Sequence, residues 1–249
     1  MYTTREARPV PLVTFKIRQD DSWVNVTSDE IFSGKNIIVF GLPGAYTPTC
    51  SSSHLPGYEA LYEVFRQHGI DEIYCLAVND TFVLNAWASD EKIKHVKMLP
   101  DGNGEFTEKM GLTFNAQELG FGKRSWRYSM LVRDGIIEKQ FIEPVEPGDP
   151  FKVSDANTLL TYIAPDAKLP QSVSLFTKPG CPFCAKAKHM LNDRNIPFEE
   201  IILGQATTSI SLKAVTGQNT TPQAFVDGVY IGDTDQLEEW LSHQEDTMT

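Results

Sequence analysis

The chain of 249 residues is 41% hydrophobic and 22% charged, with a formal net charge of -11. This composition predicts a soluble globular protein of one large or two ordinary domains. The negative charge argues against a nucleic-acid-binding protein, which needs clustered Lys and Arg, and against adhesion to anionic membranes. Residues 1–17 contain no apolar run of signal-peptide length, and no stretch of the chain is apolar for long enough to span a bilayer. We therefore expect a cytoplasmic protein without a membrane segment.

The first predicted domain covers residues 1–163 and contains strand and helix signals in alternation. Short apolar, β-branched runs predict buried strands, and apolar residues at helical spacing predict helices. In chain order the signals are a strand over Lys35–Leu42, a helix after Cys50 that ends at Gly69, a strand over Ile73–Val78, a helix around Phe82–Lys92, and a hairpin of Tyr128–Val132 and Ile136–Phe141 across Asp134-Gly135. This order predicts an α/β domain in which helices flank a mixed β-sheet.

Residues 164–171 carry two prolines and no periodicity, which predicts a linker. A second domain is expected over residues 172–249, and it again alternates between strands and helices. Its predicted strands are Val173–Thr177, Phe198–Ile202, Gln223–Val226 and Val229–Ile231. Helices are expected after the first, second and last of these strands, and the final helix has an apolar face of Leu237, Trp240 and Leu241. The fold class is therefore α/β in both domains.

The strongest local motif is the dithiol C-P-F-C at residues 181–184, directly after a predicted strand. Cys181 falls at a helix start, where unpaired N–H groups and the helix dipole favour a thiolate, and Lys178 adds a cation. We therefore expect the pKa of Cys181 to be depressed and Cys181 to act as a nucleophile. Pro182 suits the first helical turn, and Cys184 is placed to attack a mixed disulfide on Cys181. A structural zinc site and two inert thiols are the alternatives.

A second reactive cysteine is predicted at Cys50, between a buried strand and an amphipathic helix. The first turn of a helix favours an anion. Thr47 is close enough in sequence for its hydroxyl to bond a thiolate or a bound oxygen, while Pro43 and Pro48 stiffen the loop and shield the sulfur from water. These features suit attack of a thiolate on the O–O bond of a peroxide, which leaves the sulfur as a sulfenic acid.

Four other residues each allow two interpretations. Arg127 is either the cation that completes the Cys50 site or a surface residue stacked on Trp126. Cys75 lies in an apolar run, which favours a core residue over a resolving thiol. His54, one helical turn after Cys50, either assists the thiolate or lies on the helix surface. His189 is either a solvated residue, which we expect, or a participant in the reaction.

Residues 172–249 resemble the glutaredoxin family. The resemblance is carried by C-P-F-C after a strand, by Thr220-Thr221-Pro222 and by Gly232-Asp233-Thr234-Asp235. It implies a thioredoxin-like fold and a glutathione-binding site around Cys181. The family usually has Gly-Gly where this chain has Gly232-Asp233. The extra carboxylate would weaken binding of anionic glutathione unless it points to solvent.

The glutaredoxin resemblance also implies a role for each site residue. Pro222 would follow a cis peptide bond, and the backbone of Thr221 would pair with glutathione. Thr234 and Asp235 would bind the glutamyl end of glutathione at the start of the last helix. Lys178 would meet its glycyl carboxylate.

Residues 1–163 resemble the type-5-like branch of the peroxiredoxins. Pro43, Thr47 and Cys50 match the family's P-x-x-x-T-x-x-C motif. The resemblance makes Cys50 the peroxidatic cysteine and Arg127 the arginine of the site, within a thioredoxin-like fold. Taken together, the two halves are similar to bacterial peroxiredoxin–glutaredoxin hybrids.

The resemblance implies a glutathione-dependent peroxidase with no bound cofactor and no metal. Cys50 would reduce hydrogen peroxide or an alkyl hydroperoxide, glutathione would condense with the sulfenic acid, and Cys181 would release Cys50 from the mixed disulfide. A second glutathione or Cys184 would then free Cys181. Glutathione reductase would act indirectly, by returning the oxidised glutathione. The alternatives are a thiol–disulfide oxidoreductase for protein substrates and a non-enzymatic redox sensor.

The predicted linker suggests a homo-oligomer, a dimer or higher. Its residues 165–171 span at most about 24 Å, whereas a domain the size of the first is about 40 Å across. A domain tethered so closely is poorly placed to reach its own Cys50, and transfer between subunits would avoid this difficulty.

Overall fold

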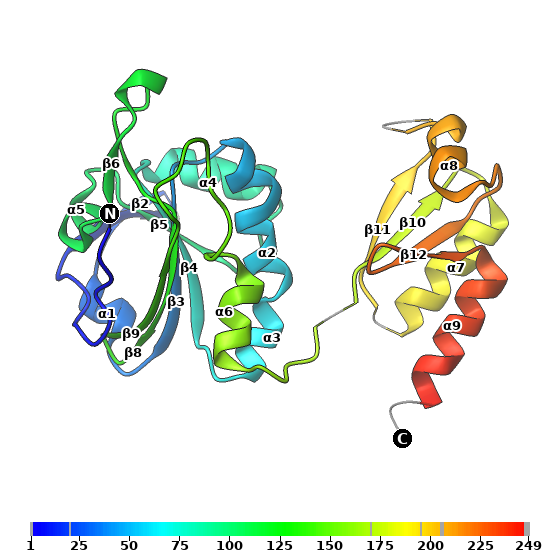
Figure 1. The fold of residues 1–249 in the computed structure, drawn as a ribbon, viewed down its shortest axis with the longest axis horizontal. Coiled ribbons are helices and arrows are strands. Elements are labelled where there is room, and N and C mark those ends of the chain that lie inside the picture. The colour runs from blue at the N-terminus through cyan, green and yellow to red at the C-terminus, as the bar shows by residue number, and fades with distance from the viewer. Residues whose placement is uncertain (1, 20, 170, 195, 205–206, 247–249) are drawn as a thin grey trace. The chain divides into compact units, whose positions relative to one another are not determined.

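Two main β-sheets, one in each half of the chain, organise the fold (Figure 1). The computed structural model describes residues 2–19, 21–169, 171–194, 196–204 and 207–246. The chain divides into two compact units, residues 1–169 and 170–249. Met1 and Thr249, the ends of the predicted domains, and Pro170 in the predicted linker lie outside the described residues. Among the described helices, none has the length and apolar character needed to cross a membrane.

The sheet of the first unit is mixed and has five strands. Their order is β5-β4-β3-β8-β9, and they cover Lys97–Pro100 (β5), Glu72–Ala77 (β4), Asn36–Leu42 (β3), Tyr128–Arg133 (β8) and Ile136–Ile142 (β9). The central strand β3 is parallel to β4 and antiparallel to β8. Its side chains alternate between two hydrophobic cores, with Phe40 in one and Val39 in the other. Both faces of the sheet are thus buried, as the apolar run predicted.

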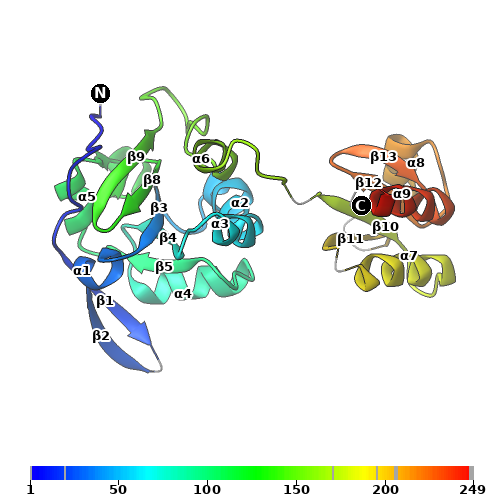
Figure 2. The ribbon, with the colours of Figure 1, turned by 90° about the horizontal axis from the view of Figure 1, so that it is seen from below.

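Helices cover both faces of this sheet. On one face lie α2 (Leu55–Ala60), α3 (Tyr62–Gln67), α4 (Thr81–Asp90) and α6 (Ala156–Ile163). On the other lie α1 (Ser28–Phe32) and α5 (Glu105–Met110), with the strand β1 (Thr14–Gln19). Figure 2 shows the hairpin of β1 and β2 (Ser22–Thr27) extending away from the main sheet. A second hairpin joins β6 (Thr113–Asn115) through the 3-10 turn η2 (Gln117–Leu119) to β7 (Lys123–Ser125).

The helix that carries Cys50 begins with an irregular turn. Residues Cys50–His54 form a π-helical turn, η1, in which the backbone N–H of Leu55 bonds the carbonyl of Cys50. The predicted helix is therefore present, but it is wound more widely where it carries the cysteine. Such turns are rare and are frequent at functional sites.

The sheet of the second unit has four strands in the order β11-β10-β12-β13. These strands are Phe198–Ile202 (β11), Val173–Thr177 (β10), Gln223–Val226 (β12) and Val229–Gly232 (β13), and the helices are α7 (Pro182–Asp193), α8 (Ser209–Thr216) and α9 (Thr234–Asp246). Leu237 and Leu241 of α9 pack with Leu191 of α7 in the core of this unit, and Trp240 is half-buried against it. The predicted order of strands and helices is confirmed.

A close approach between β3 and β8 gives a test of the packing in the first unit. Gly41 lies opposite Tyr128, and a Cβ added at Gly41 would come within 2.1 Å of the tyrosine ring. Because Tyr128 is fully buried, we expect Gly41→Ala to lower the free energy of unfolding by about 1–3 kcal/mol or more.

Urea unfolding followed by tryptophan fluorescence would measure this change. Gly57→Ala is the matched control, because the added Cβ meets nothing closer than 3.8 Å and lies within α2. We expect the control to be neutral or slightly stabilising. Equal stabilities of the two variants would contradict the close contact.

Candidate active sites

Cys50 is fully buried at the start of η1, beneath the loop that follows β3. The Thr47 hydroxyl donates to the Gly44 carbonyl at 2.9 Å, and the Ser51 N–H donates to the Thr47 carbonyl at 3.1 Å. Thr47 thus holds the loop onto the first turn of the helix. Donation from its hydroxyl to the sulfur or to a bound oxygen, which the sequence led us to expect, requires the hydroxyl to turn away from Gly44.

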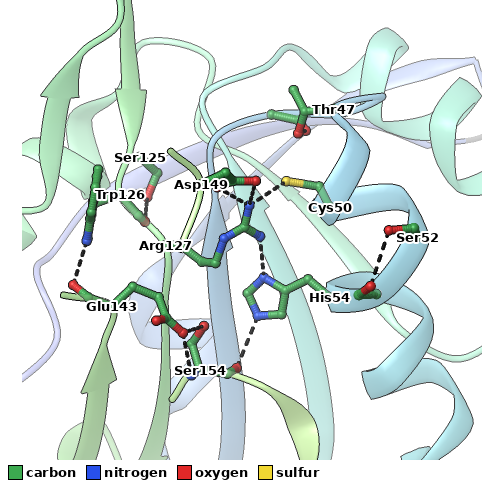
Figure 3. A network of polar contacts seen from close by, with 12 residues as sticks. Thr47, Cys50, Ser52, His54, Ser125, Trp126, Arg127, Glu143, Asp149 and Ser154 are labelled. Atoms are coloured by element: carbon green, nitrogen blue, oxygen red, sulfur yellow. Dashed lines mark hydrogen bonds and ion pairs between the residues drawn. The ribbon is translucent and has the colours of Figure 1, made fainter. Parts of the chain in front are cut away.

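The Arg127 guanidinium lies against Cys50, although the two residues are far apart in sequence (Figure 3). Nη2 is 3.5 Å from the Cys50 Sγ, and Nη1 is 3.1 Å from Nδ1 of His54. Only 1% of Arg127 is exposed. The interpretation as a surface arginine stacked on Trp126 is therefore wrong, and the structure brings Arg127 to Cys50.

Asp149 is the residue of this site that the sequence did not reveal. Its two carboxylate oxygens lie 2.6 and 2.7 Å from Nη2 of Arg127, the same nitrogen that contacts Cys50. Burial alone would lower the pKa of Arg127, but the Cys50 sulfur and the Asp149 carboxylate outweigh it and raise that pKa. The guanidinium is therefore a permanent cation beside the sulfur.

His54 is fully buried and holds the other side of the guanidinium. Its Nε2 lies 3.1 Å from the Ser154 carbonyl, which only accepts, so Nε2 carries the proton and Nδ1 accepts from Arg127. Burial, and then the charge of Arg127, put the pKa of His54 well below 6.5. The imidazole is therefore neutral, and the interpretation of His54 as a helix-surface residue is wrong.

A buried carboxylate fixes the carbonyl that His54 needs. Glu143, only 1% exposed, accepts from the backbone N–H groups of Lys152, Val153 and Ser154 at 2.8 to 2.9 Å. This carboxylate folds the chain between β9 and α6 into a turn, and the turn presents the Ser154 carbonyl to His54. The network from Cys50 to Glu143 can be followed in Figure 3.

A mostly apolar cavity of about 230 Å³ opens above this network. The residues that line it include Pro43, Thr47, Phe114, Leu119, Phe121 and Trp126. Arg127 and Asp149 are the charged groups that line it among the described residues. The cavity thus offers a small, poorly hydrated approach to the cation beside Cys50.

Cys75 lies in the core behind Cys50 and is fully buried. Burial, and then the neighbouring Cys50, raise the pKa of the Cys75 thiol well above its usual value. These properties agree with the prediction of a core residue and argue against a resolving thiol. His189 is exposed on α7, as predicted, with its ring near Asp193.

In the second unit, Cys181 caps the start of α7. The backbone N–H of Cys184 donates to the Cys181 Sγ at 3.2 Å, and the Thr221 hydroxyl lies 3.8 Å from it. Burial would raise the pKa of Cys181, but hydrogen bonds from Cys184, Thr221 and Phe183 together lower it. Burial, and then the bond with Cys181, raise the pKa of Cys184. The lowered pKa of Cys181 agrees with the depressed value expected from the sequence, and hydrogen-bond donors, including backbone N–H groups at the helix start, account for it.

The other residues expected to bind glutathione gather around Cys181. Lys178, Thr221, Pro222, Thr234 and Asp235 all line a cavity of about 660 Å³ beside it. The Thr221-Pro222 peptide bond is cis, as the resemblance implied. Cys184 is almost fully buried on the inner side of the helix start. The described residues contain no cluster of three or more His, Cys, Asp or Glu that could hold a metal ion.

Asp233, where the glutaredoxin pattern has glycine, lines the same cavity. Its carboxylate accepts the backbone N–H of Asp235 at 2.9 Å. The carboxylate therefore lies at the start of α9 and occupies an amide that an anionic ligand would otherwise use. Asp233 both lines the cavity and is exposed, so a weakening effect on glutathione binding remains a prediction.

Comparison with known proteins divides the chain into the same two parts as the structure does. The redoxin family model matches residues 6–160, and the glutaredoxin family model matches residues 173–231. The hybrid peroxiredoxin hyPrx5 of Haemophilus influenzae is 58% identical over 240 residues, which cover 96% of this chain and 100% of that protein. A peroxiredoxin of Synechocystis, sll1621, is 53% identical over 167 residues, covering 62% of this chain and 88% of the relative.

Solved structures resemble the first unit. Reduced Prx3 of Vibrio vulnificus in complex with H2O2 has a TM-score of 0.61 and 34% identity, and covers 65% of this chain and 99% of its own. The 1-Cys peroxiredoxin antioxidant protein of Plasmodium falciparum has a TM-score of 0.62 and 31% identity, and covers 65% of this chain and 100% of its own.

The buried neutral His54 predicts a pH dependence of stability. Because its pKa in the fold lies well below 6.5, the unfolded chain takes up a proton below that pH which the folded chain does not. The stability that His54 contributes is therefore complete above about pH 6.5 and is lost as the pH falls towards the folded pKa, by up to about 1.4 kcal/mol per pH unit.

Urea unfolding between about pH 7.5 and pH 5.5 would compare the wild type with His54→Gln, whose amide keeps a donor for the Ser154 carbonyl. We expect the wild type to lose more stability than the variant over this range. An equal loss in both would show that His54 is not held neutral in the fold.

The contact of the Thr221 hydroxyl with the Cys181 sulfur leads to a prediction for the rate at which Cys181 is alkylated. Thr221→Val keeps the shape of the side chain but removes a donor that favours the thiolate, so we expect alkylation of Cys181 by iodoacetamide near neutral pH to slow roughly two- to fivefold. Thr220→Val is the matched control, because the Thr220 hydroxyl bonds Gln223 rather than Cys181. Peptide mass spectrometry would give the rates, and equal slowing in both variants would contradict the assignment.

Proposed function

Because the chain belongs to the hybrid peroxiredoxins, in which a redoxin domain precedes a glutaredoxin domain, we propose that it is a glutathione-dependent peroxidase. Cys50 reduces hydrogen peroxide and alkyl hydroperoxides, and the glutaredoxin domain recycles it. The observation that carries the proposal is the buried Arg127 guanidinium, 3.5 Å from the Cys50 sulfur at the base of an apolar cavity. The activity places the protein in antioxidant defence and in the redox balance of the cell.

In the first step the Cys50 thiolate attacks the terminal oxygen of the hydroperoxide. An S–O bond forms as the O–O bond breaks, the sulfur gives up two electrons and becomes a sulfenic acid, and the departing alkoxide or hydroxide takes a proton from solvent. Arg127 stabilises the thiolate and the negative charge that develops on the leaving oxygen, since its charge is fixed at the sulfur and is shielded from water. Thr47, which lines the cavity, supplies a further donor once its hydroxyl turns.

The cavity supports both kinds of peroxide. Hydrogen peroxide is small enough for any such opening, and the aromatic wall of Phe114, Phe121 and Trp126 favours the apolar part of an alkyl hydroperoxide. The same wall excludes bulk water, which strengthens the attraction between Arg127 and charge on the reacting oxygens.

In the second step the thiol of glutathione condenses with the sulfenic acid. Water leaves and a mixed disulfide forms on Cys50. A small external thiol is needed because Cys75, the other cysteine of this unit, is fully buried in the core.

In the third step the Cys181 thiolate attacks the glutathione sulfur and releases the Cys50 thiolate. A second glutathione, or Cys184, then attacks the new disulfide on Cys181. The low pKa of Cys181 supports this order, because a thiolate attacks and leaves more readily than a thiol. In sum, two glutathione molecules are oxidised for each peroxide reduced.

The cavity beside Cys181 supports glutathione as the reductant. Lys178 offers a cation to its glycyl carboxylate, and the backbone of Thr221 offers strand-like pairing to its cysteinyl part. Thr234 and Asp235, at the start of α9, line the same cavity and would face the glutamyl end, which must compete with the Asp233 carboxylate for the Asp235 amide. Glutathione binds as a co-substrate, and the mechanism uses no other bound group.

Three further expectations belong to this proposal. The chain works as a homo-oligomer in which the glutaredoxin domain of one subunit serves Cys50 of another. A glutathione reductase returns the oxidised glutathione. The protein works in the cytoplasm.

The proposal predicts the behaviour of three cysteine variants in a coupled assay. Peroxide-dependent oxidation of NADPH, with glutathione and glutathione reductase, would be measured for each full-length chain. We expect Cys50→Ser to fall to the uncatalysed background, because no other thiol meets the peroxide. Cys181→Ser should fall by about tenfold or more, because it loses a tethered partner thiol. Cys75→Ala should keep its activity.

Three outcomes would contradict the proposal in different ways. Peroxidase activity that survives in Cys50→Ser would favour a thiol–disulfide oxidoreductase in which the first domain does not react with peroxide. Full activity of Cys181→Ser would show that the glutaredoxin domain serves other substrates. A single turnover by the wild type would favour a redox sensor.

A further inference from the structure

The charge of Cys50 changes during the proposed cycle, whereas the charge of Arg127 does not. The attacking sulfur is an anion, but the Cys50 sulfur carries no charge in the sulfenic acid and in the mixed disulfide that follow. Arg127 is only 1% exposed and stays ionised throughout. A buried cation whose anionic partner disappears is strongly destabilising. The site therefore needs a second anion that does not take part in the chemistry.

The surroundings of the guanidinium supply one such anion. Within the described part of the chain, the only carboxylate paired with Arg127 is that of Asp149, which contacts Nη2 through both oxygens. The side chain of Asp149 is 41% exposed and lines the cavity, so this carboxylate keeps part of its hydration. The pair thus joins a buried cation to a half-exposed anion, which lowers the desolvation penalty of an ion pair.

The other titratable groups around the site cannot replace Asp149. His54, from η1, is neutral and accepts from Arg127. Cys75, from β4, has a raised pKa and stays protonated. Glu143, after β9, directs its carboxylate at the backbone of residues 152–154. Cys50 itself is therefore the only other anion that these elements bring to the guanidinium.

We propose that Asp149 is a positioning residue that acts as the permanent counter-charge of Arg127, keeping the guanidinium paired and in place while Cys50 passes through its neutral sulfenic acid and disulfide states. The inference rests on the proposed function, because it is the peroxidase cycle that makes the Cys50 charge come and go. Asp149 touches neither the sulfur nor the peroxide in this scheme. It acts through Arg127.

The shared nitrogen gives the proposal a second consequence. The Cys50 sulfur and the Asp149 carboxylate both contact Nη2, so the two anions lie close together and compete for one cation. Asp149 thereby weakens the hold of Arg127 on the thiolate. Without Asp149 the Cys50 thiolate would form more readily. It would attack peroxide more slowly, because oxidation to the uncharged sulfenic acid would leave Arg127 with no anionic partner.

A double-mutant cycle tests the counter-charge directly. Thermal unfolding of the reduced full-length chain would be followed by tryptophan fluorescence for the wild type, Asp149→Asn, Cys50→Ser and the double variant. The measurements would be made at a pH at which Cys50 is ionised. That pH would be found from the thiolate absorbance at 240 nm of a Cys181→Ser chain, in which the Cys181 thiolate does not contribute. We expect Asp149→Asn and Cys50→Ser each to be tolerated, since each leaves Arg127 one anion. The double variant should lose at least about 3 °C more in Tm than the two single variants together.

Additive Tm shifts would overturn the proposal, because they would show that neither anion depends on the other. The matched control is Glu146→Gln, which removes a carboxylate from the same loop that is paired with Lys152 and not with Arg127. Its combination with Cys50→Ser should be additive. The double-mutant cycle involves no turnover, so its result is independent of the coupled assay. Additive Tm shifts can be found for an active peroxidase, and non-additive shifts can be found for a chain without peroxidase activity.

The second consequence is tested in Cys181→Ser chains, where the ionisation of Cys50 can be followed. We expect Asp149→Asn to move the midpoint of the 240 nm titration down by about half a pH unit. Stopped-flow measurements at a pH above both midpoints should show slower oxidation of Cys50 by hydrogen peroxide. A loss of structure alone would not give more thiolate together with slower attack. An unchanged or higher midpoint, or an unchanged rate, would overturn the proposal.

Discussion

The burial of one positive charge is the constraint on which the peroxidase unit depends. Arg127 directly precedes β8 and has almost no access to solvent, and a buried guanidinium needs acceptors for its donors and an anion for its charge. His54 serves as an acceptor because its proton is held on Nε2 by the Ser154 carbonyl. That carbonyl is in turn fixed by Glu143. The conformation of the chain between β9 and α6 therefore supplies, through His54, an acceptor for a cation that lies outside this segment.

The glutaredoxin unit stabilises its thiolate by a different physical means. Among the described residues, no buried cation lies beside Cys181, and Lys178 is exposed. The pKa of Cys181 is lowered by backbone and side-chain donors at the start of α7. This difference suits the two reactions. Attack on a peroxide develops charge on an oxygen that a cation must stabilise, whereas thiol–disulfide exchange moves charge between sulfurs.

Local sequence signals predicted the strands β3, β4, β8 and β9 and the order of elements in the second unit, because such strands and the helix starts at Cys50 and Cys181 are determined by neighbouring residues. The hairpin of β1 and β2 was missed, as were α1, β5, α5, α6 and the hairpin of β6 and β7. Alternating apolar residues could have revealed the first hairpin, and the Thr27–Glu30 capping box could have revealed α1. Asp149 could not have been found in this way. Its partner Arg127 lies on another element, and nothing in the loop itself distinguishes this carboxylate from that of Glu146, which pairs with an exposed lysine.

The position of Asp149 at the cavity wall explains how a cation can be neutralised and still act on the sulfur. A carboxylate buried as deeply as Arg127 would cancel most of its field at Cys50, because its own repulsion of a sulfur anion would be unscreened where water is excluded. A carboxylate that is 41% exposed is screened by solvent. It holds the guanidinium in place but leaves much of its attraction for the thiolate. The depth of the cation and the exposure of its partner therefore decide together how strongly the site favours an anionic sulfur.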